Sequence, residues 1–167
     1  MNDGIFWRLI EETQSNDLDE QIDRLKERIA KLSNAELVDF ENAMRTWLEK
    51  CDRGPLIDAA TIMTGYVSDD AFMYWRAALL MHGKKAAENA IQDPETLADH
   101  AYFTGCEDLL YLVQKEYEKR HDRLLPGATI YEDEIDDDCG EQFENIEDAL
   151  KAYPRLQEKF WEKWPGA

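Results

Sequence analysis

The segment with the most evident chemical potential reads Ser68-Asp69-Asp70-Ala71-Phe72-Met73-Tyr74-Trp75-Arg76. Two adjacent carboxylates at the start of a helix can hold a cation or accept hydrogen bonds from a ligand. The structural alternative is a serine cap followed by two acids, whose charge suits the positive end of the helix dipole. We therefore interpret the segment as a helix start that is also a candidate ligand or partner site, formed by Ser68, Asp69, Asp70, Tyr74 and Arg76.

A second feature is a run of acids in the last third of the chain. Ten Asp and Glu residues fall between Glu132 and Asp148, and no Lys or Arg occurs from Leu124 to Leu150. So many like charges disfavour burial, and they predict a long acidic loop over residues 127–144. The loop would attract a basic partner, or alternatively keep the protein soluble. Its candidate steering residues are Glu132, Asp133, Glu134, Asp136, Asp137, Asp138 and Glu141.

The motifs of metal sites and of common enzymes are missing. If Gly140 were the central glycine of a calcium-binding EF-hand, Ile135 and Ile146 would occupy positions that require oxygen ligands. The three histidines are too widely spaced for a local zinc motif, and the three cysteines form no CxxC pair. No P-loop, dinucleotide-binding glycine motif or G-x-S-x-G sequence occurs. We therefore predict no metal, no cofactor and no catalytic residue.

The elements that must position these residues have helical spacing. Apolar residues recur at intervals of four and three from Leu18 to Leu32, which is typical of a helix with one buried face. Ser33 and Glu36 form a capping-box pattern that begins the next helix, and Thr104 and Glu107 repeat this pattern before a long helix. The spacing also predicts a helix over residues 69–82 that buries Phe72, Trp75 and Leu79.

Length, composition and charge define the class of protein. A chain of 167 residues fits a single domain over residues 1–167, and the helical spacing predicts an all-α, multi-helix bundle of about eight to ten helices. The 37 Asp and Glu residues against 19 Lys and Arg give a net charge of −18, which excludes nucleic acid and anionic membranes as partners. No apolar run approaches the roughly 20 residues of a membrane helix. Three scattered cysteines favour a reducing, cytoplasmic location.

Five segments of the chain are distinctive: FWRLIE (6–11), GYVSDDAFMYWR (65–76), DPETLA (93–98), EDLLYLVQKEYE (107–118) and YPRLQEKF (153–160). The first three resemble an uncharacterised bacterial domain family of unknown function, DUF4240, and the last two are similar to the family's second half. The resemblance extends over about residues 3 to 164, and its most specific part is SDDxFxYxR. Trp75 stands where such members usually carry phenylalanine. The resemblance implies an intact, mostly helical bacterial domain and no particular activity.

Three classes of function remain open. We favour a non-enzymatic interaction module for a basic partner protein, of the kind that immunity proteins and antitoxins form with nuclease toxins. The alternative is an enzyme or small-ligand binder with a pocket around Asp69, Asp70, Tyr74 and Arg76. The third is an adaptor in a larger assembly, which an exposed apolar patch would indicate. The sequence sets no oligomeric state.

Overall fold

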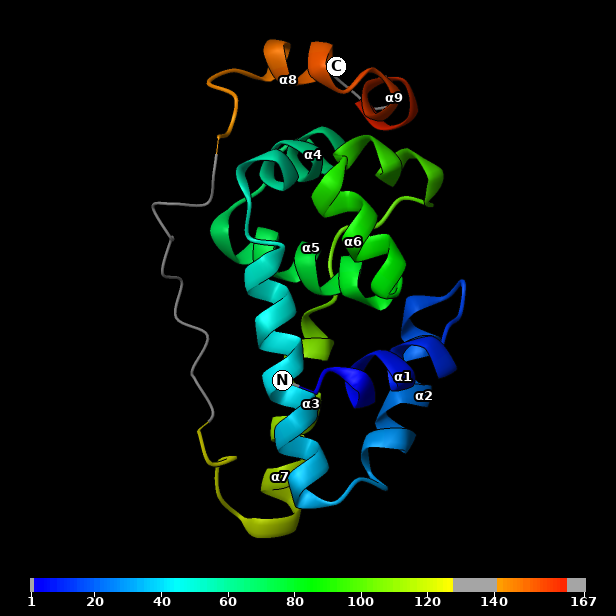
Figure 1. The fold of residues 1–167 in the computed structure, drawn as a ribbon, viewed down its shortest axis with the longest axis vertical. Helices are drawn as coiled ribbons and strands as arrows, with labels where there is room; N and C mark the ends of the chain where they lie inside the picture. Colours follow the sequence, from blue (N-terminus) through cyan, green and yellow to red (C-terminus); the bar gives the residue numbers. More distant parts are fainter. Residues whose placement is uncertain (1, 128–140, 162–167) are drawn as a thin grey trace.

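The computed structural model describes residues 2–127 and 141–161, and every regular element in these ranges is a helix (Figure 1). In chain order the elements are α1 (Gly4–Glu12), α2 (Leu18–Ile29), α3 (Asn34–Lys50), α4 (Gly54–Thr64), α5 (Asp69–Met81), α6 (Lys84–Gln92), the 3-10 helix η1 (Pro94–Asp99), α7 (Glu107–His121), α8 (Ile146–Ala152), α9 (Pro154–Leu156) and the π-helical turn η2 (Gln157–Trp161). Because α9 continues directly into η2, they count as one helix, and residues 2–127 and 141–161 together contain ten helices. The prediction of an all-α fold with eight to ten helices is confirmed.

Helix α3 is central to the bundle because it contacts α1, α5 and α7. Figure 1 shows it along the long axis of the molecule, with α7 beside its first half and with α1 and α2 on one side. Its apolar residues recur at helical spacing, so that Leu37, Phe40 and Met44 are fully buried. In α2, Ile22, Leu25 and Ile29 are likewise buried and Leu18 is half-buried, which confirms the face predicted from its spacing.

Helix α4 is buried on more than one side. It contacts α5, η1, α8, α9 and η2, and Figure 1 shows α8 and α9 lying across it at one end of the molecule. Its apolar residues are therefore not confined to one stripe: Leu56, Ala59, Ala60, Ile62 and Met63 are all buried. We call residues 141–161, which include α8, α9 and η2, the C-terminal strap.

Trp75 on α5 lies at the centre of an aromatic cluster. Its side chain is 0% exposed, its ring stacks on Phe72 with centroids 6.0 Å apart, and it contacts Phe103 at 5.3 Å. Leu79 is also fully buried. The predicted burial of this face of α5 is confirmed.

Some helices begin where the local sequence predicts, and others begin where a tertiary contact places them. Ser33 and Glu36 form the predicted capping box, with Ser33 N donating to the Glu36 carboxylate at 2.8 Å. The prediction of a second capping box at Thr104 and Glu107 is wrong. Helix α7 begins after Cys106, and no hydrogen bond from a side chain caps its start. The reason is tertiary, because Cys106 N donates to Tyr74 O at 2.9 Å and this bond holds the chain before α7 against α5.

Side chains of neighbouring helices bind the carbonyl groups at helix ends. Gln14 and Gln21 both donate from Nε2 to Met81 O at the end of α5, at 2.7 and 2.8 Å. Arg120 of α7 donates to Leu32 O and Ala30 O just beyond α2, at 2.7 and 2.8 Å. These bonds satisfy carbonyls that lack partners within their own helices, and they connect helices that are distant in sequence.

Candidate functional site

The predicted site residues at the start of α5 have a structural role in the first turn. Ser68 Oγ accepts a hydrogen bond from Ala71 N at 3.2 Å, as expected of a helix cap. Asp69 and Asp70 follow in the first turn, and both side chains are exposed. Within the described residues neither carboxylate forms an ion pair, so both remain available to a partner molecule.

Arg76 lies apart from these acids, on the side of α5 that faces α3. Its Nη1 donates to Leu48 O at 2.8 Å and lies 3.7 Å from the Asp52 carboxylate. Its guanidinium stacks over Phe72 at 4.8 Å from the ring centroid. Burial lowers the pKa of Arg76, and the charge of Asp52 opposes that effect. Arg76 therefore caps the end of α3, and the structure does not bring it together with Asp69 and Asp70.

Tyr74 faces α7 instead. Its hydroxyl lies close enough to Glu107, Tyr111 and Asp70 for all three to affect its ionisation. Partial burial raises the pKa of Tyr74, and these three neighbours raise it further. Asp70 and Tyr74 are four residues apart on α5, as Glu107 and Tyr111 are on α7, so each pair lies on one helical face.

Gly105 allows α5 and the start of α7 to approach this closely. A Cβ atom at this position would lie 2.8 Å from the Cβ of Tyr74 and 3.2 Å from its backbone carbonyl carbon. The first distance is shorter than real Cβ contacts allow and the second is tighter than most of them, so only glycine fits without a shift of these neighbours. Gly105 thereby places Glu107 beside Tyr74.

A small groove continues this surface between the starts of α2 and α7. Its volume is about 160 Å³, and it is lined by Leu18, Asp19, Ile22, Gly105, Cys106, Glu107 and Asp108. The apolar members are half-buried or buried, whereas the three carboxylates are exposed. In the ranges that the structure describes, none of these carboxylates forms an ion pair. We call Asp19, Asp70, Tyr74, Glu107 and Asp108 together the acidic face.

The thiol of Cys106 contributes no nucleophile to this groove. Burial raises its pKa to about 11, and the nearby charges of Asp108 and Asp19 act in the same direction. A thiol with such a pKa is almost entirely protonated at neutral pH, and the protonated form is a poor nucleophile. The groove therefore offers negative charge and apolar contact rather than covalent chemistry.

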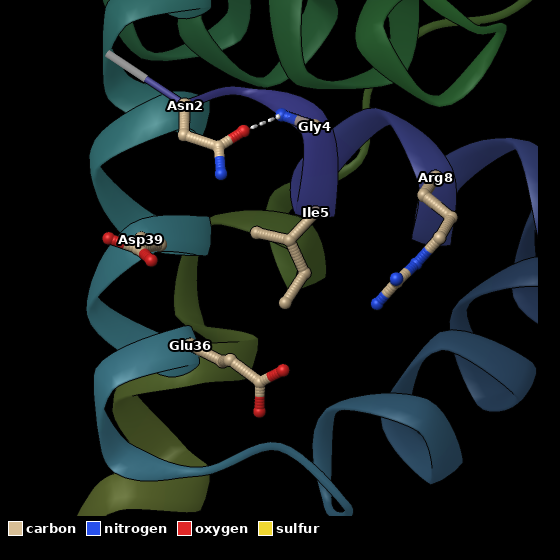
Figure 2. A pocket seen from close by; sticks show the side chains of 6 residues that line it. All are labelled: Asn2, Gly4, Ile5, Arg8, Glu36 and Asp39. Carbon is tan, nitrogen blue, oxygen red and sulfur yellow. Dashed lines mark hydrogen bonds between the residues drawn. The ribbon is translucent and has the colours of Figure 1, made fainter.

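A larger groove of about 450 Å³ separates α1 from α3 (Figure 2). Figure 2 shows Ile5 pointing into it, with Arg8 and Glu36 on opposite walls. Glu36 is held by the capping box, and its pKa is lowered first by the bonds with Ser33 and then by the charge of Arg8. Arg8 is exposed and has no hydrogen bond or ion pair within the described chain. The walls of this groove therefore carry both positive and negative charge. No sequence motif predicted it.

The remaining predicted site residues are placed as follows. Glu132, Asp133, Glu134, Asp136, Asp137 and Asp138 lie outside the described residues, whereas Glu141 is described and exposed. Of the histidines, His82 and His100 have ring centroids 5.3 Å apart. No group of three or more metal-ligating side chains occurs in residues 2–127 and 141–161. No helix in those ranges is long and apolar enough to cross a membrane.

Sequence reasoning found two members of the acidic face, Asp70 and Tyr74, and missed the other three. Asp19, Glu107 and Asp108 occur in the first turns of α2 and α7, where acids are common for reasons of helix stability alone. The four-residue spacing of Glu107 and Tyr111 indicates that they share a face of α7. The sequence does not show that this face packs against α5.

These helices and this site define a small all-α domain with a negatively charged face. The chain belongs to the DUF4240 family of proteins of unknown function, whose family model matches residues 1–119. No curated protein and no solved structure matches the chain. The match confirms the predicted family and includes every residue of the acidic face, whereas the C-terminal strap lies beyond it.

Proposed function

We propose that this protein is a non-enzymatic interaction module that binds a basic partner protein through the acidic face. The observation that supports this proposal is the set of unpaired carboxylates beside an apolar groove. Asp19, Glu107 and Asp108 lie around buried Ile22 and Cys106 and form no ion pair with any described residue. A Lys or Arg of a partner would place its aliphatic stem on the apolar floor and its charge among the carboxylates.

The size of the groove favours a side chain over a small substrate. Its 160 Å³ is below the roughly 300–1,000 Å³ of typical small-molecule sites. The alternative function, an enzyme or ligand binder around Asp69, Asp70, Tyr74 and Arg76, has less support because Arg76 is bound to the end of α3. Neither groove is lined by any of these four residues.

The overall charge supports the same kind of partner. A net charge of −18 attracts a basic protein over a distance, and such attraction raises association rates more than it slows dissociation. The acidic residues 132–138 would add to this steering. A cytoplasmic location is part of the proposal, and it is supported by Cys51 and Cys106, which are free thiols buried in the described chain.

The test begins with proteins that co-purify with the chain from its native host, followed by binding kinetics with the identified partner. The acidic-face variant combines Asp70→Asn, Glu107→Gln and Asp108→Asn. We expect association at low salt to slow at least tenfold, and the defect to shrink as salt screens the charges. Replacing Asp136, Asp137 and Asp138 with Asn tests the steering segment by the same measurement.

The matched control combines Glu49→Gln, Glu88→Gln and Glu118→Gln, three exposed acids that form no ion pair in the described chain. It changes the net charge by the same amount at other places on the surface. Equal effects of both triple variants would mean that only net charge matters. A partner whose binding ignores the acidic-face variant would refute the proposed site.

A further inference from the structure

The C-terminal strap covers a buried carboxylate of the family domain. Asp58 of α4 is only 4% exposed, and its Oδ2 accepts a hydrogen bond from Phe143 N at 3.1 Å. The strap passes so close to the start of α4 that a Cβ atom on Gly54 would lie 2.7 Å from the backbone of Glu141 and Gln142. The first residues of the strap therefore shield Asp58 from water.

Other anchors hold the rest of the strap on η1. The Glu95 carboxylate accepts hydrogen bonds from Arg155 N at 3.0 Å and from Leu156 N at 3.2 Å, at the start of α9. Lys159 donates to the carbonyls of Ala98 and His100. Glu95 is half-buried, so Asp58 is the strap-binding carboxylate that is fully enclosed.

Among the described residues, no positive charge compensates that of Asp58. Tyr153 of the strap lies near Asp58: burial raises the pKa of Tyr153 most, and the charges of Asp58, of Asp93 before η1 and of Glu95 in η1 raise it further. No Lys, Arg or His of the described chain forms an ion pair with Asp58. Burial raises the pKa of Asp58 to about 6, and the hydrogen bond from Phe143 N opposes this effect only in part.

We infer that the C-terminal strap is a proton-coupled latch, which binds the α4–η1 face more tightly when Asp58 carries a proton. A protonated carboxyl still accepts the Phe143 N–H through its oxygen, and no charge is then enclosed. When the strap leaves, water can hydrate the carboxylate, so the open form favours ionisation. Closing of the strap and binding of a proton by Asp58 therefore promote each other.

The direction and size of the effect follow from linkage. The pKa of Asp58 in the closed form, about 6, is above its ordinary value of 3.8. Closing is therefore favoured fully below the ordinary value, and this gain is lost as the pH rises through 6. If the open form has the ordinary pKa, the closing equilibrium strengthens about tenfold between pH 7 and pH 5. Most other carboxylates stay ionised in this window.

The test measures hydrogen exchange of the strap amides in the full chain at pH 5 and pH 7, as protection factors that correct for intrinsic exchange. Relative to amides of α3, protection of Phe143 and of the start of α9 should rise about tenfold at pH 5. In Asp58→Asn the strap should be protected at pH 7 as strongly as the natural chain is at pH 5, with no further change on acidification. His100, whose carbonyl binds Lys159 of the strap, is present in both proteins and cannot produce their difference.

Glu95→Gln is the matched control, because it alters a strap anchor that is not enclosed. It should loosen α9 at both pH values and keep the tenfold pH effect at Phe143. A carbon-13 NMR titration of the Asp58 carboxyl in the natural chain needs no variant and should give a pKa near 6. A titration near 4, strap protection that ignores pH in the natural chain, or an unchanged pH effect in Asp58→Asn would each overturn the latch.

Discussion

Trp75→Ala is the sharpest test of how the fold positions the acidic face. Trp75 lies on α5 one residue after Tyr74, and its side chain is 0% exposed. Its ring fills the space between Phe72 and Phe103, with centroid distances of 6.0 and 5.3 Å. Alanine would remove the whole ring from a site where two aromatic neighbours cannot collapse into the space without moving their own helix or loop.

The expected loss of stability is about 3–5 kcal/mol, the usual range for replacing a buried tryptophan by alanine. In a domain of this length each kcal/mol lowers the melting temperature by about 2–4 °C, so the melting temperature should fall by roughly 6–20 °C. Trp75→Phe should cost less than about 1.5 kcal/mol, because it keeps most of the ring volume. It also removes the indole N–H, which has no hydrogen-bond partner among the residues that the structure describes.

Thermal and urea unfolding, followed by far-UV circular dichroism, provide the measurement. Tyr66→Ala is the control, since Tyr66 is 79% exposed and its removal should change the stability by no more than about 0.5 kcal/mol. A fall in melting temperature below about 2 °C for Trp75→Ala, similar to that of Tyr66→Ala, would show that the aromatic cluster does not hold α5 in place.

Two further predictions concern the same region. Gly105→Ala should destabilise the fold by about 1–3 kcal/mol in urea unfolding, because its Cβ would lie 2.8 Å from the Cβ of Tyr74; an unchanged stability would contradict that close approach. In a Cys139→Ser variant, Cys51 and Cys106 should react with a thiol reagent at pH 8 only after unfolding. The reason is that burial raises their pKa values to about 12 and about 11. Rapid labelling of the native protein would refute this prediction.

Local signals in the sequence predicted most of the helices. The cap residues Ser33 and Ser68 each accept a backbone N–H at the start of the helix that was predicted there. Such bonds join residues two or three positions apart, so the information needed to predict them lies within one turn. The apolar stripe of α2 was equally readable, because one helix needs only a repeating pattern to bury one face.

The candidate site was predicted only in part, since it depends on contacts between helices. Asp70 and Tyr74 share a face of α5, but Arg76 is two residues beyond Tyr74 and so points about 200° away around the helix axis. No pattern within α5 shows that α7 supplies Glu107 to this face and that α3 receives Arg76. The false capping box at Thr104 has the same origin, because the bond from Cys106 N to Tyr74 O holds the chain before α7 against α5.

The acidity of the surface also follows from how the fold uses its few cations. Arg24 donates to Gln14 O after α1, Arg120 to carbonyls after α2, Arg76 to Leu48 O in the last turn of α3, and Lys159 to carbonyls at the end of η1. A cation suits the negative end of a helix dipole, and there it satisfies carbonyls that lack partners. Three of these cations also pair with a nearby acid: Arg24 with Glu20, Arg76 with Asp52 and Arg120 with Glu116. With only 19 Lys and Arg against 37 acids, cations committed in this way cannot neutralise other surface carboxylates. These bonds stabilise the bundle, but within the described residues the carboxylates of the acidic face have no ion pair. A basic partner would supply the positive charge that they lack.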